Sequence, residues 1–262
     1  RQASIKAGLP IEVPAVTVNV VCGSGLNCVN MAAQMIQAGD ADIVVAGGME
    51  NMSMAPYALQ KARFGYRMNN GVVVDTMVND ALTDAFNNYH MMITAENVAD
   101  QWGLKREELD AFAASSQQKA VAAQESGRFK DEIVPVEVKS RKKTVIVDTD
   151  EGPRPGTTVQ VLQGLRKLFK EDGVISAGTS SQMSDGASAV LIMSSEKAQE
   201  LGVKPMAKII ARTVVGSDPT LMLTGPIEAT KRVLQKANLT IEEIDTYEVN
   251  EAFAPVPIVW AK

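Results

Sequence analysis

The stretch from Ala15 to Gly48 constrains the fold of this 262-residue chain more than any other part of it. Residues Ala15–Val21 are rich in β-branched side chains and apolar on both faces, which predicts a strand buried in a sheet. Two glycines in Cys22–Gly25 predict a turn. The nearly uncharged run Leu26–Ala38 predicts a buried helix, and Asp42–Ala46 predicts a second buried strand. This order of elements indicates an α/β protein.

Cys22 lies at the predicted point where the first strand ends and the helix begins. Unpaired backbone N–H groups and the positive end of the helix dipole stabilise a thiolate at such a position. A thiolate placed there can accept an acyl group. Free cysteines are also among the most buried residue types, so an inert packing role is the alternative. Cys28, inside the predicted helix, is expected to be of the inert kind.

The sequence of this stretch closely resembles the active-cysteine segment of the thiolases, over the residues VCGSGLNCVNMAAQMIQAGDADIVVAGGMENMSMAPY. Further matching runs follow in the order that the family has them: YHMMITAENVA, GRFKDEIVPV, DEGPRPGTT, SDGASAVLIMS, GPIEATKRVL and VNEAFAPVP. The resemblance covers essentially the whole chain. It implies a thiolase-like α/β fold with two repeated βαβ-type halves, mixed sheets and a covering loop domain. It also implies that Cys22 is the nucleophile that becomes acylated.

The resemblance implies an acyltransferase, specifically an acetyl-CoA C-acetyltransferase that forms or cleaves acetoacetyl-CoA through a Cys22 acyl-enzyme. Coenzyme A thioesters are then substrates, and neither a separate cofactor nor a metal is expected. Four alternatives stay open. They are a thiolase for longer 3-ketoacyl-CoA chains, a ketoacyl synthase, a cysteine hydrolase that uses Cys22 with His90, and a non-catalytic coenzyme A-binding segment. The CGSG and GGMENMS motifs differ from the corresponding sequences of the ketoacyl synthases.

The family's motifs imply a pocket for the substrate and coenzyme A at the following positions: Leu82, His90, Met91, Arg154, Leu165, Phe169, Ala177, Ser181, Met183, Met222, Ala252 and Phe253. Arg154 stands between two prolines, which presents a fixed guanidinium suited to phosphate, although an Arg simply exposed on a turn is the alternative. His90 is the only histidine of the chain. A hydrogen-bonded packing role is the alternative for it, and we do not assign it as the catalytic base.

Asn250 is the second candidate catalytic residue, at the end of the predicted strand Ile244–Val249. An Asn amide can donate to a developing oxyanion, directly or through water. The alternative is a turn residue, which is the usual role of Asn. The resemblance favours the first interpretation, because the asparagine of the thiolase NEAF motif holds a water in an oxyanion hole.

Composition excludes several classes of protein. Hydrophobic residues at 45% and charged residues at 22% are ordinary for a soluble globular protein, and a formal charge of −5 does not favour nucleic acid or an anionic membrane. No apolar run is long enough to span a membrane. Two cysteines exclude a disulfide scaffold and fit a reducing compartment, so we expect a cytoplasmic protein. A homodimer or homotetramer is implied by the resemblance.

The rest of the chain predicts helices and strands in alternation. Helices are expected from Asp75 to about Phe86 and over Thr94–Trp102, Arg106–Ser126, Ser194–Leu201 and Pro226–Ala237. Strands are expected over Val134–Val138, Thr144–Val147, Ala189–Met193 and Ala207–Val215. Leu162, Leu165 and Phe169 are expected to form an apolar helix face. The charges of the two helices Thr94–Trp102 and Arg106–Ser126 are interpreted as a solvated face.

Four segments are expected from this organisation. Residues 1–52 form a partial N-terminal thiolase half with the nucleophile, residues 53–184 a loop and coenzyme A-binding domain, residues 185–202 a return strand and helix, and residues 203–262 a partial C-terminal half. The chain begins without Met and ends within an apolar run, so we expect a segment of a longer protein. The resemblance implies that a catalytic histidine in a GHP motif and a second cysteine in a CGGG-like motif would lie downstream. Neither motif occurs in this sequence, so the isolated segment is expected to be nearly inactive.

Overall fold

The computed structural model describes residues 1–262 and divides into two compact units. Unit 1 comprises Arg1–Ala55, Asp185–Val214 and Lys231–Ile241, and unit 2 comprises Pro56–Ser184, Val215–Thr230 and Glu242–Lys262. The roles assigned from the sequence to residues 1–52, 53–184, 185–202 and 203–262 stay predictions. Each unit is described by itself below.

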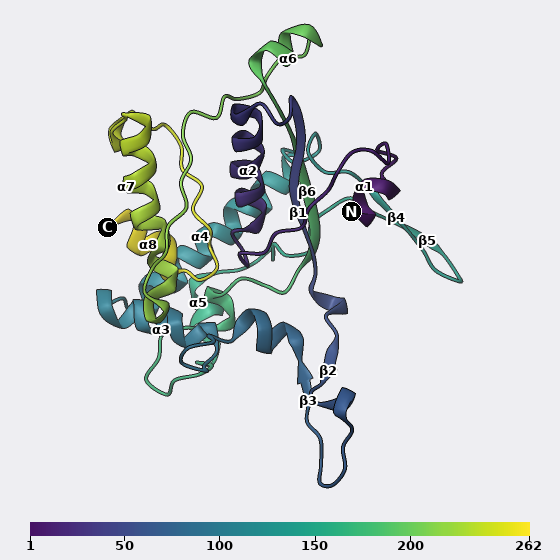
Figure 1. Ribbon diagram of the computed structural model, residues 1–262. Coiled ribbons are helices and arrows are strands. Elements are labelled where there is room, and N and C mark those ends of the chain that lie inside the picture. The colour runs from purple at the N-terminus through teal and green to yellow at the C-terminus, as the bar shows by residue number, and fades with distance from the viewer. The chain divides into compact units, whose positions relative to one another are not determined.

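Unit 1 is built on an antiparallel pair of strands, β1 (Ile43–Asn51) and β6 (Asp185–Met193), with helix α2 (Ser24–Ala38) beside it (Figure 1). A Cβ on Gly47 would lie 2.1 Å from the carbonyl oxygen of Ser188, and a Cβ on Gly48 would lie 3.5 Å from the Cα of Gly25. The pairing of β1 with β6 therefore depends on a glycine at position 47, whereas the separation at Gly48 is an ordinary van der Waals contact. The unit also contains α1 (Gln2–Lys6), the 3-10 helix η1 (Met52–Met54) and α6 (Ser195–Glu200).

The predicted helix and second strand of this unit are confirmed. Helix α2 begins at Ser24 and ends before Gly39, whose left-handed φ of 80° closes the helix as a glycine typically does. Only Ala32 and Ala33 of the helix are buried, so the expectation of a wholly buried helix is wrong. Strand β1 continues past the two glycines at which it was expected to end. Ala46 is its one buried residue and Val45 is 56% exposed, so the expectation of a buried strand is also wrong.

Three predicted strands do not form: Ala15–Val21, Ala207–Val215 and Ile244–Val249 have no place in any ladder. Their β-branched residues favour extended backbone, but a strand also needs a neighbour with which to exchange hydrogen bonds. Val16 is 76% exposed, which contradicts the expected buried strand. The extended run near Arg212 is instead held to α2 by side chains, since the Arg212 guanidinium donates to the Gln37 amide oxygen at 2.7 Å.

Unit 2 contains two hairpins and several helices. The hairpins are β2 (Tyr57–Leu59) with β3 (Val73–Asp75), and β4 (Val136–Lys139) with β5 (Thr144–Val147). The helices are η2 (Ala62–Phe64), η3 (Met77–Leu82), α3 (Met91–Trp102), α4 (Arg106–Glu125), α5 (Val159–Gln163), η4 (Ala177–Thr179), η5 (Pro219–Thr224) and α8 (Pro255–Ala261). Helix α7 (Gly225–Ala237) and the 3-10 helix η6 (Ile241–Glu243) each cross the boundary between the units.

The core of unit 2 forms where α3 packs against α8 and the start of α4. Its members are apolar residues that are nearly inaccessible to solvent: Ala95, Val98, Ala99, Leu104, Leu109, Ile175, Phe253, Ala254, Val256 and Val259. A smaller cluster joins α4 to α5 through Ala113, Ala114 and Leu162. Burying these side chains is the main favourable term for the unit. Helix α8, which the sequence did not predict, begins at Pro255, a residue suited to a first helical turn.

Several expectations for unit 2 need correction. The helix expected from Asp75 to Phe86 is a single π-helical segment, η3. Helix α5 ends at Gln163, so Leu165 and Phe169 do not share a helix face with Leu162. The charged residues of α3 and α4 are not all solvated, because the exposed fraction is 2% for Glu96 and 0% for Asp110. The helices α3 and α4 themselves, and the hairpin β4–β5, are confirmed.

Candidate functional site

The Cys22 thiol is exposed in unit 1, two positions before the first residue of α2. Gly23 caps the helix and its carbonyl accepts the first intrahelical bond, from the N–H of Asn27 at 2.9 Å. Cys22 is therefore not a buried cysteine, and its role as the nucleophile stays a prediction. Cys28, on the same helix, is partly buried. The turn thus presents one of the two thiols of the chain to solvent, as a nucleophile requires.

Val21, the residue before Cys22, has a left-handed backbone with φ of 52°. This conformation is unusual for a β-branched residue and costs about 1–3 kcal/mol. Side chains from both sides hold it: the Asn19 amide oxygen accepts from the Val21 N–H at 2.8 Å, and the Ser24 hydroxyl donates to the Val21 carbonyl at 2.6 Å. The Ser24 hydroxyl also accepts from the N–H of Val20 at 2.9 Å. The cysteine turn is strained and locally braced.

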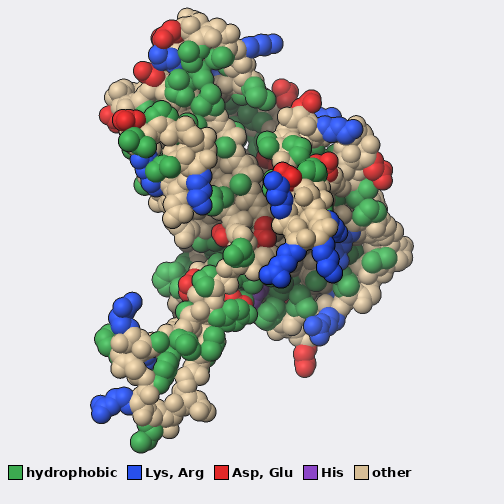
Figure 2. Space-filling view, turned by 90° about the vertical axis from the view of Figure 1, so that its right-hand side faces the viewer, with side chains coloured by type: hydrophobic (Ala, Val, Ile, Leu, Met, Phe, Trp, Pro, Cys, Tyr) green, Lys and Arg blue, Asp and Glu red, His purple; other side chains and the backbone are tan.

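In unit 2, His90 lies at the start of α3 and packs against Phe169. The two rings are stacked with centroids 4.7 Å apart and planes at 17°. His90 Nδ1 accepts from the N–H of Met92 at 3.1 Å and so caps α3, which places the proton of the neutral ring on Nε2. Burial lowers the pKa of His90. Figure 2 shows only a small patch of this histidine at the surface. The packing role is real, and Nε2 keeps a free N–H donor.

Two segments that carry predicted site residues are joined by backbone hydrogen bonds. The N–H of Ser181 donates to the carbonyl of Ala252 at 2.9 Å, and the N–H of Ala254 donates to the carbonyl of Thr179 at 2.9 Å. Phe253, between them, is buried in the core of unit 2. The structure therefore brings Ala177–Ser181 and Ala252–Phe253 together, although they are distant in sequence.

Arg154 lies exposed on the loop between β5 and α5. Its backbone N–H donates to the Gln117 side-chain oxygen at 2.8 Å, and its carbonyl accepts from the Thr157 hydroxyl at 2.9 Å. The guanidinium itself makes no hydrogen bond or ion pair. Its backbone is thus fixed while its charge is available, which suits an anionic ligand. A hollow of about 180 Å³ lies beside the loop, lined by Ser116, Gln117, Ala120, Gly152, Pro153 and Gln182.

Gly178 provides the contact between the short helix η4 and the end of α5. A Cβ on Gly178 would lie 2.4 Å from a methyl of Leu162 and 2.8 Å from a methyl of Leu165. The carbonyls of both leucines accept from Nη2 of Arg106, at 2.6 and 3.2 Å. Arg106 is in turn held by Asp110, whose two carboxylate oxygens each lie 2.8 Å from Nε. Leu165, a predicted pocket residue, is therefore positioned by a buried ion pair.

The remaining predicted residues are less constrained. Asn250 is exposed on extended chain rather than at a strand end, and the adjacent Glu251 accepts from the Ser116 hydroxyl at 2.6 Å. The exposed fraction is 64% for Met183 and 37% for Met222. Every predicted site residue except Cys22 belongs to unit 2. The roles proposed for them at the sequence level stay predictions.

Sequence reasoning missed the polar residues that hold these segments in place, chiefly Glu96, Arg106 and Asp110. A signal for Glu96 was present. It lies four residues after Met92 and three before Ala99, on the helix face that packs into the core. Asp110 likewise follows Arg106 by four residues, the spacing of an intrahelical ion pair.

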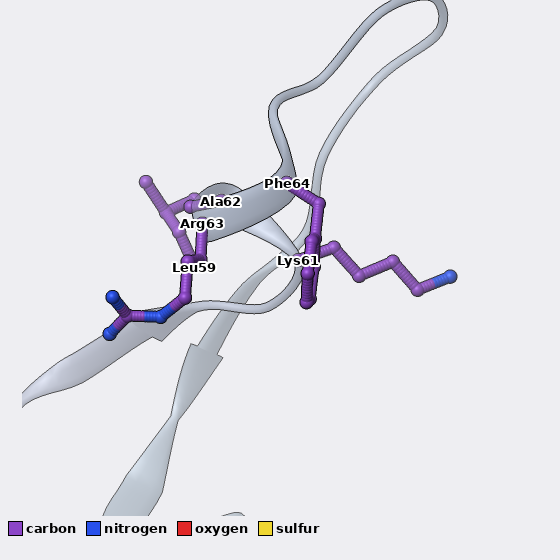
Figure 3. Close-up of a pocket in the computed structure, with 5 residues that line it drawn as sticks. All are labelled: Leu59, Lys61, Ala62, Arg63 and Phe64. Carbon is purple, nitrogen blue, oxygen red and sulfur yellow. The ribbon is translucent and has the colours of Figure 1, made fainter.

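Another hollow, of about 680 Å³, is lined by Leu59, Lys61, Ala62, Arg63 and Phe64 (Figure 3). All five come from one short segment that begins with the last residue of β2, and in Figure 3 the Lys61 and Arg63 side chains point away from each other. None of them is a predicted site residue, so this hollow is not the candidate site. No group of three or more His, Cys, Asp or Glu side chains is placed to hold a metal ion, and no helix is long and apolar enough to cross a membrane.

This chain is therefore an α/β protein in which an exposed cysteine, a candidate nucleophile, lies just before the first turn of a helix. The family model for the thiolase N-terminal domain matches residues 1–196, and the model for the thiolase C-terminal domain matches residues 203–262. The chain belongs to the thiolase family.

Individual relatives agree with the family models. An acetyl-CoA acetyltransferase of Pseudomonas aeruginosa is 55% identical over 255 residues, which are 97% of this chain and 65% of the relative. The crystal structure of the Bacillus anthracis acetyl-CoA acetyltransferase matches with a TM-score of 0.96 at 41% identity, over 99% of this chain and 66% of that one. The crystal structure of human mitochondrial 3-ketoacyl-CoA thiolase matches with a TM-score of 0.95 at 39% identity, over 99% and 66%. The chain has the thiolase fold and spans about two thirds of these relatives' length.

Proposed function

We propose that the protein to which this chain belongs is an acetyl-CoA C-acetyltransferase that works through an acyl-enzyme on Cys22. The observation that carries the proposal is the exposed Cys22 thiol on a braced turn directly before α2. Relatives that are 52–55% identical to this chain bear the name acetyl-CoA acetyltransferase, which supports the same substrates here.

The proposed reaction has two stages. The Cys22 sulfur attacks the carbonyl carbon of acetyl-CoA, the bond from that carbon to the coenzyme A sulfur breaks, and coenzyme A leaves as the thiol. A base then removes a proton from the α-carbon of a second acetyl-CoA, and that carbon bonds to the acyl carbon on Cys22. The bond from the acyl carbon to the Cys22 sulfur breaks, so acetoacetyl-CoA leaves and the Cys22 sulfur is returned to its starting form. Asn250 is proposed to stabilise an oxyanion through water. The base and second acid are expected from family motifs outside this chain, so we expect little turnover from the 262 residues alone.

The residues of unit 2 are proposed to hold the thioester. The free guanidinium of Arg154 suits a phosphate group of coenzyme A. The Nε2–H of His90 is a donor available to a thioester or amide oxygen, and the exposed face of Phe169 suits an apolar or aromatic part of the ligand. The other proposed contacts are Leu82, Met91, Leu165, Ala177, Ser181, Met183, Met222, Ala252 and Phe253.

The test is to trap the full-length protein with acetyl-CoA and to locate the acetyl group by mass spectrometry of its peptides. We expect the adduct on Cys22 in the wild type and in Cys28→Ala, and no adduct in Cys22→Ala. Cys28→Ala is the matched control, because it removes the other thiol of the same helix. An adduct on any other residue would refute the proposed mechanism.

A second candidate is a thiolase for longer 3-ketoacyl-CoA chains, because the human mitochondrial 3-ketoacyl-CoA thiolase matches almost as well as the acetyltransferase. Comparing kcat/KM for acetoacetyl-CoA with that for longer 3-ketoacyl-CoA esters separates the two. A hydrolase would release free acid without a second coenzyme A, and a non-catalytic protein would bind coenzyme A without turnover. A homodimer or homotetramer in the reducing cytoplasm, where a nucleophilic thiol stays reduced, completes the proposal.

A further inference from the structure

Glu96 is a buried carboxylate that the acyl-transfer chemistry does not use. Its exposed fraction is 2%, and it lies on α3 in unit 2. Both of its oxygens accept from the N–H of Val174, at 3.1 and 2.9 Å, and one also accepts from the N–H of Ile175 at 2.9 Å. Burying a carboxylate is costly unless hydrogen bonds compensate for the lost water. Glu96 therefore fixes the backbone of two residues that belong to no helix or strand.

Gly173 fits the same interaction. A Cβ on Gly173 would lie 2.2 Å from one Glu96 oxygen and 2.8 Å from the carboxyl carbon. Any side chain there would push the carboxylate from the amides it binds. Ile175 and Ser176, which follow the partly buried Val174, are 1% and 0% exposed. The segment Gly173–Ser176 is thus held at one side by Glu96 and enclosed by the core.

This segment leads directly into residues of the proposed thioester pocket. The N–H of Ser176 donates to the Thr179 hydroxyl at 2.9 Å, which starts the short helix η4. The backbone bonds from Thr179 and Ser181 to Ala254 and Ala252 follow within a few residues. A shift at Val174 therefore moves the backbone of Ala177–Ser181, because few flexible residues lie between them.

We propose that Glu96 is a positioning residue for coenzyme A thioester binding, acting through Val174 and Ile175 on Ala177–Ser181. The inference rests on the proposed function, because it assigns coenzyme A to this loop. Glu96 touches no substrate and takes no part in bond making. Its effect is expected on substrate affinity rather than on the chemical step.

Glu96→Gln tests the proposal, because it keeps the shape but turns an NH₂ group toward the amide N–H of Val174. In the full-length protein we expect the Kd for coenzyme A by calorimetry, and the KM for acetyl-CoA, to rise at least about fivefold, with kcat changed less than about twofold. Hydrogen exchange of the Val174 and Ile175 amides should accelerate. Gly173→Ala should raise the same Kd and KM, because its methyl group would displace the Glu96 carboxylate. This variant replaces Glu96→Gln in the test if Glu96→Gln does not fold.

Leu109→Ala is the matched control, since Leu109 is fully buried in the same core and has no hydrogen bond to the segment. It should lower Tm at least as much as Glu96→Gln and leave the Kd for coenzyme A nearly unchanged. Unchanged affinity in Glu96→Gln, or losses of affinity that follow Tm equally in both variants, would overturn the proposal. A wild-type protein that binds no coenzyme A in this assay would instead refute the proposed function, and the inference with it.

Discussion

Replacing Asp110 by Asn is the sharpest test of how unit 2 is held together. Both carboxylate oxygens of Asp110 lie 2.8 Å from Nε of Arg106, and the exposed side-chain fractions are 0% for Asp110 and 15% for Arg106. The amide of the variant keeps one acceptor but carries no charge. Arg106 would then be nearly buried without a counter-ion, while its other contacts, to the carbonyls of Leu162 and Leu165, remain.

The expected loss is about 3 kcal/mol of unfolding free energy, the lower end of the range for a buried ion pair that loses one partner. The lower end applies because Arg106 retains some access to water and two carbonyl acceptors. For a unit of this size, about 2–4 °C of Tm is lost per kcal/mol, so Tm should fall by about 6–12 °C.

The measurement is denaturant unfolding followed by tryptophan fluorescence, because both tryptophans of this chain, Trp102 and Trp260, belong to unit 2. The matched control is Asp100→Asn, which breaks an ion pair of the same unit to Lys170 at 2.6 Å. The exposed side-chain fractions of that pair are 60% for Asp100 and 37% for Lys170. That control should change stability far less than Asp110→Asn, as exposed pairs do. Equal losses in the two variants would show that burial of the Arg106 pair does not govern its contribution.

Three further outcomes are expected. Burial lowers the pKa of His90 below its ordinary 6.5, so the contribution of the neutral ring to stability is complete above pH 6.5 and is lost as the pH falls from 6.5 through the pKa of the folded state. His90→Asn keeps an oxygen that can cap the helix and should flatten this part of the curve of unfolding free energy against pH. Gly178→Ala places a methyl against two leucine methyls and should lower the unfolding free energy by about 1–3 kcal/mol in fluorescence-monitored denaturation, with no change contradicting the close contact. Gly47→Ala directs its Cβ at the carbonyl oxygen of Ser188, so β1 and β6 should separate; faster alkylation of Cys28 reports this in unit 1, and an unchanged rate would count against the observed register.

The sequence predicted best where one local pattern decides the outcome. Helices α3 and α4 and the hairpin β4–β5 follow from apolar spacing and turn residues that lie within each element. The strands expected at Ala15–Val21 and Ala207–Val215 failed because a strand is a property of two segments, and the pattern of one segment does not supply the other. Strand β6 was found only in its second half, since its first residues, Asp185–Ser188, are small or polar.

The sequence pointed to Cys22 as a candidate nucleophile, but it did not show how the structure supports that residue. Motifs identified Cys22 and the likeness to thiolases, and the structure shows Cys22 exposed at the start of a helix. Nothing in the motifs indicated that Val21 takes a left-handed conformation, because Val is the wrong residue type for it. The hydrogen bonds of Asn19 and Ser24 with the backbone of Val21 could therefore be recognised only from the structure.

In unit 2, buried charged side chains form hydrogen bonds with backbone groups that would otherwise have no partner, as neighbouring strands do in a sheet. The segments 164–176 and 177–183 contain almost no regular structure, so most of their backbone groups have no periodic partners. Glu96 supplies an acceptor to two amide groups of this chain, and Arg106 supplies a donor to two carbonyls. Each charge is costly to bury, but an unpartnered backbone group is also costly, and one ion or carboxylate satisfies several such groups at once. An irregular loop that must keep a fixed shape for a ligand therefore needs buried polar anchors, and polarity on an otherwise apolar helix face is the sequence signal for them.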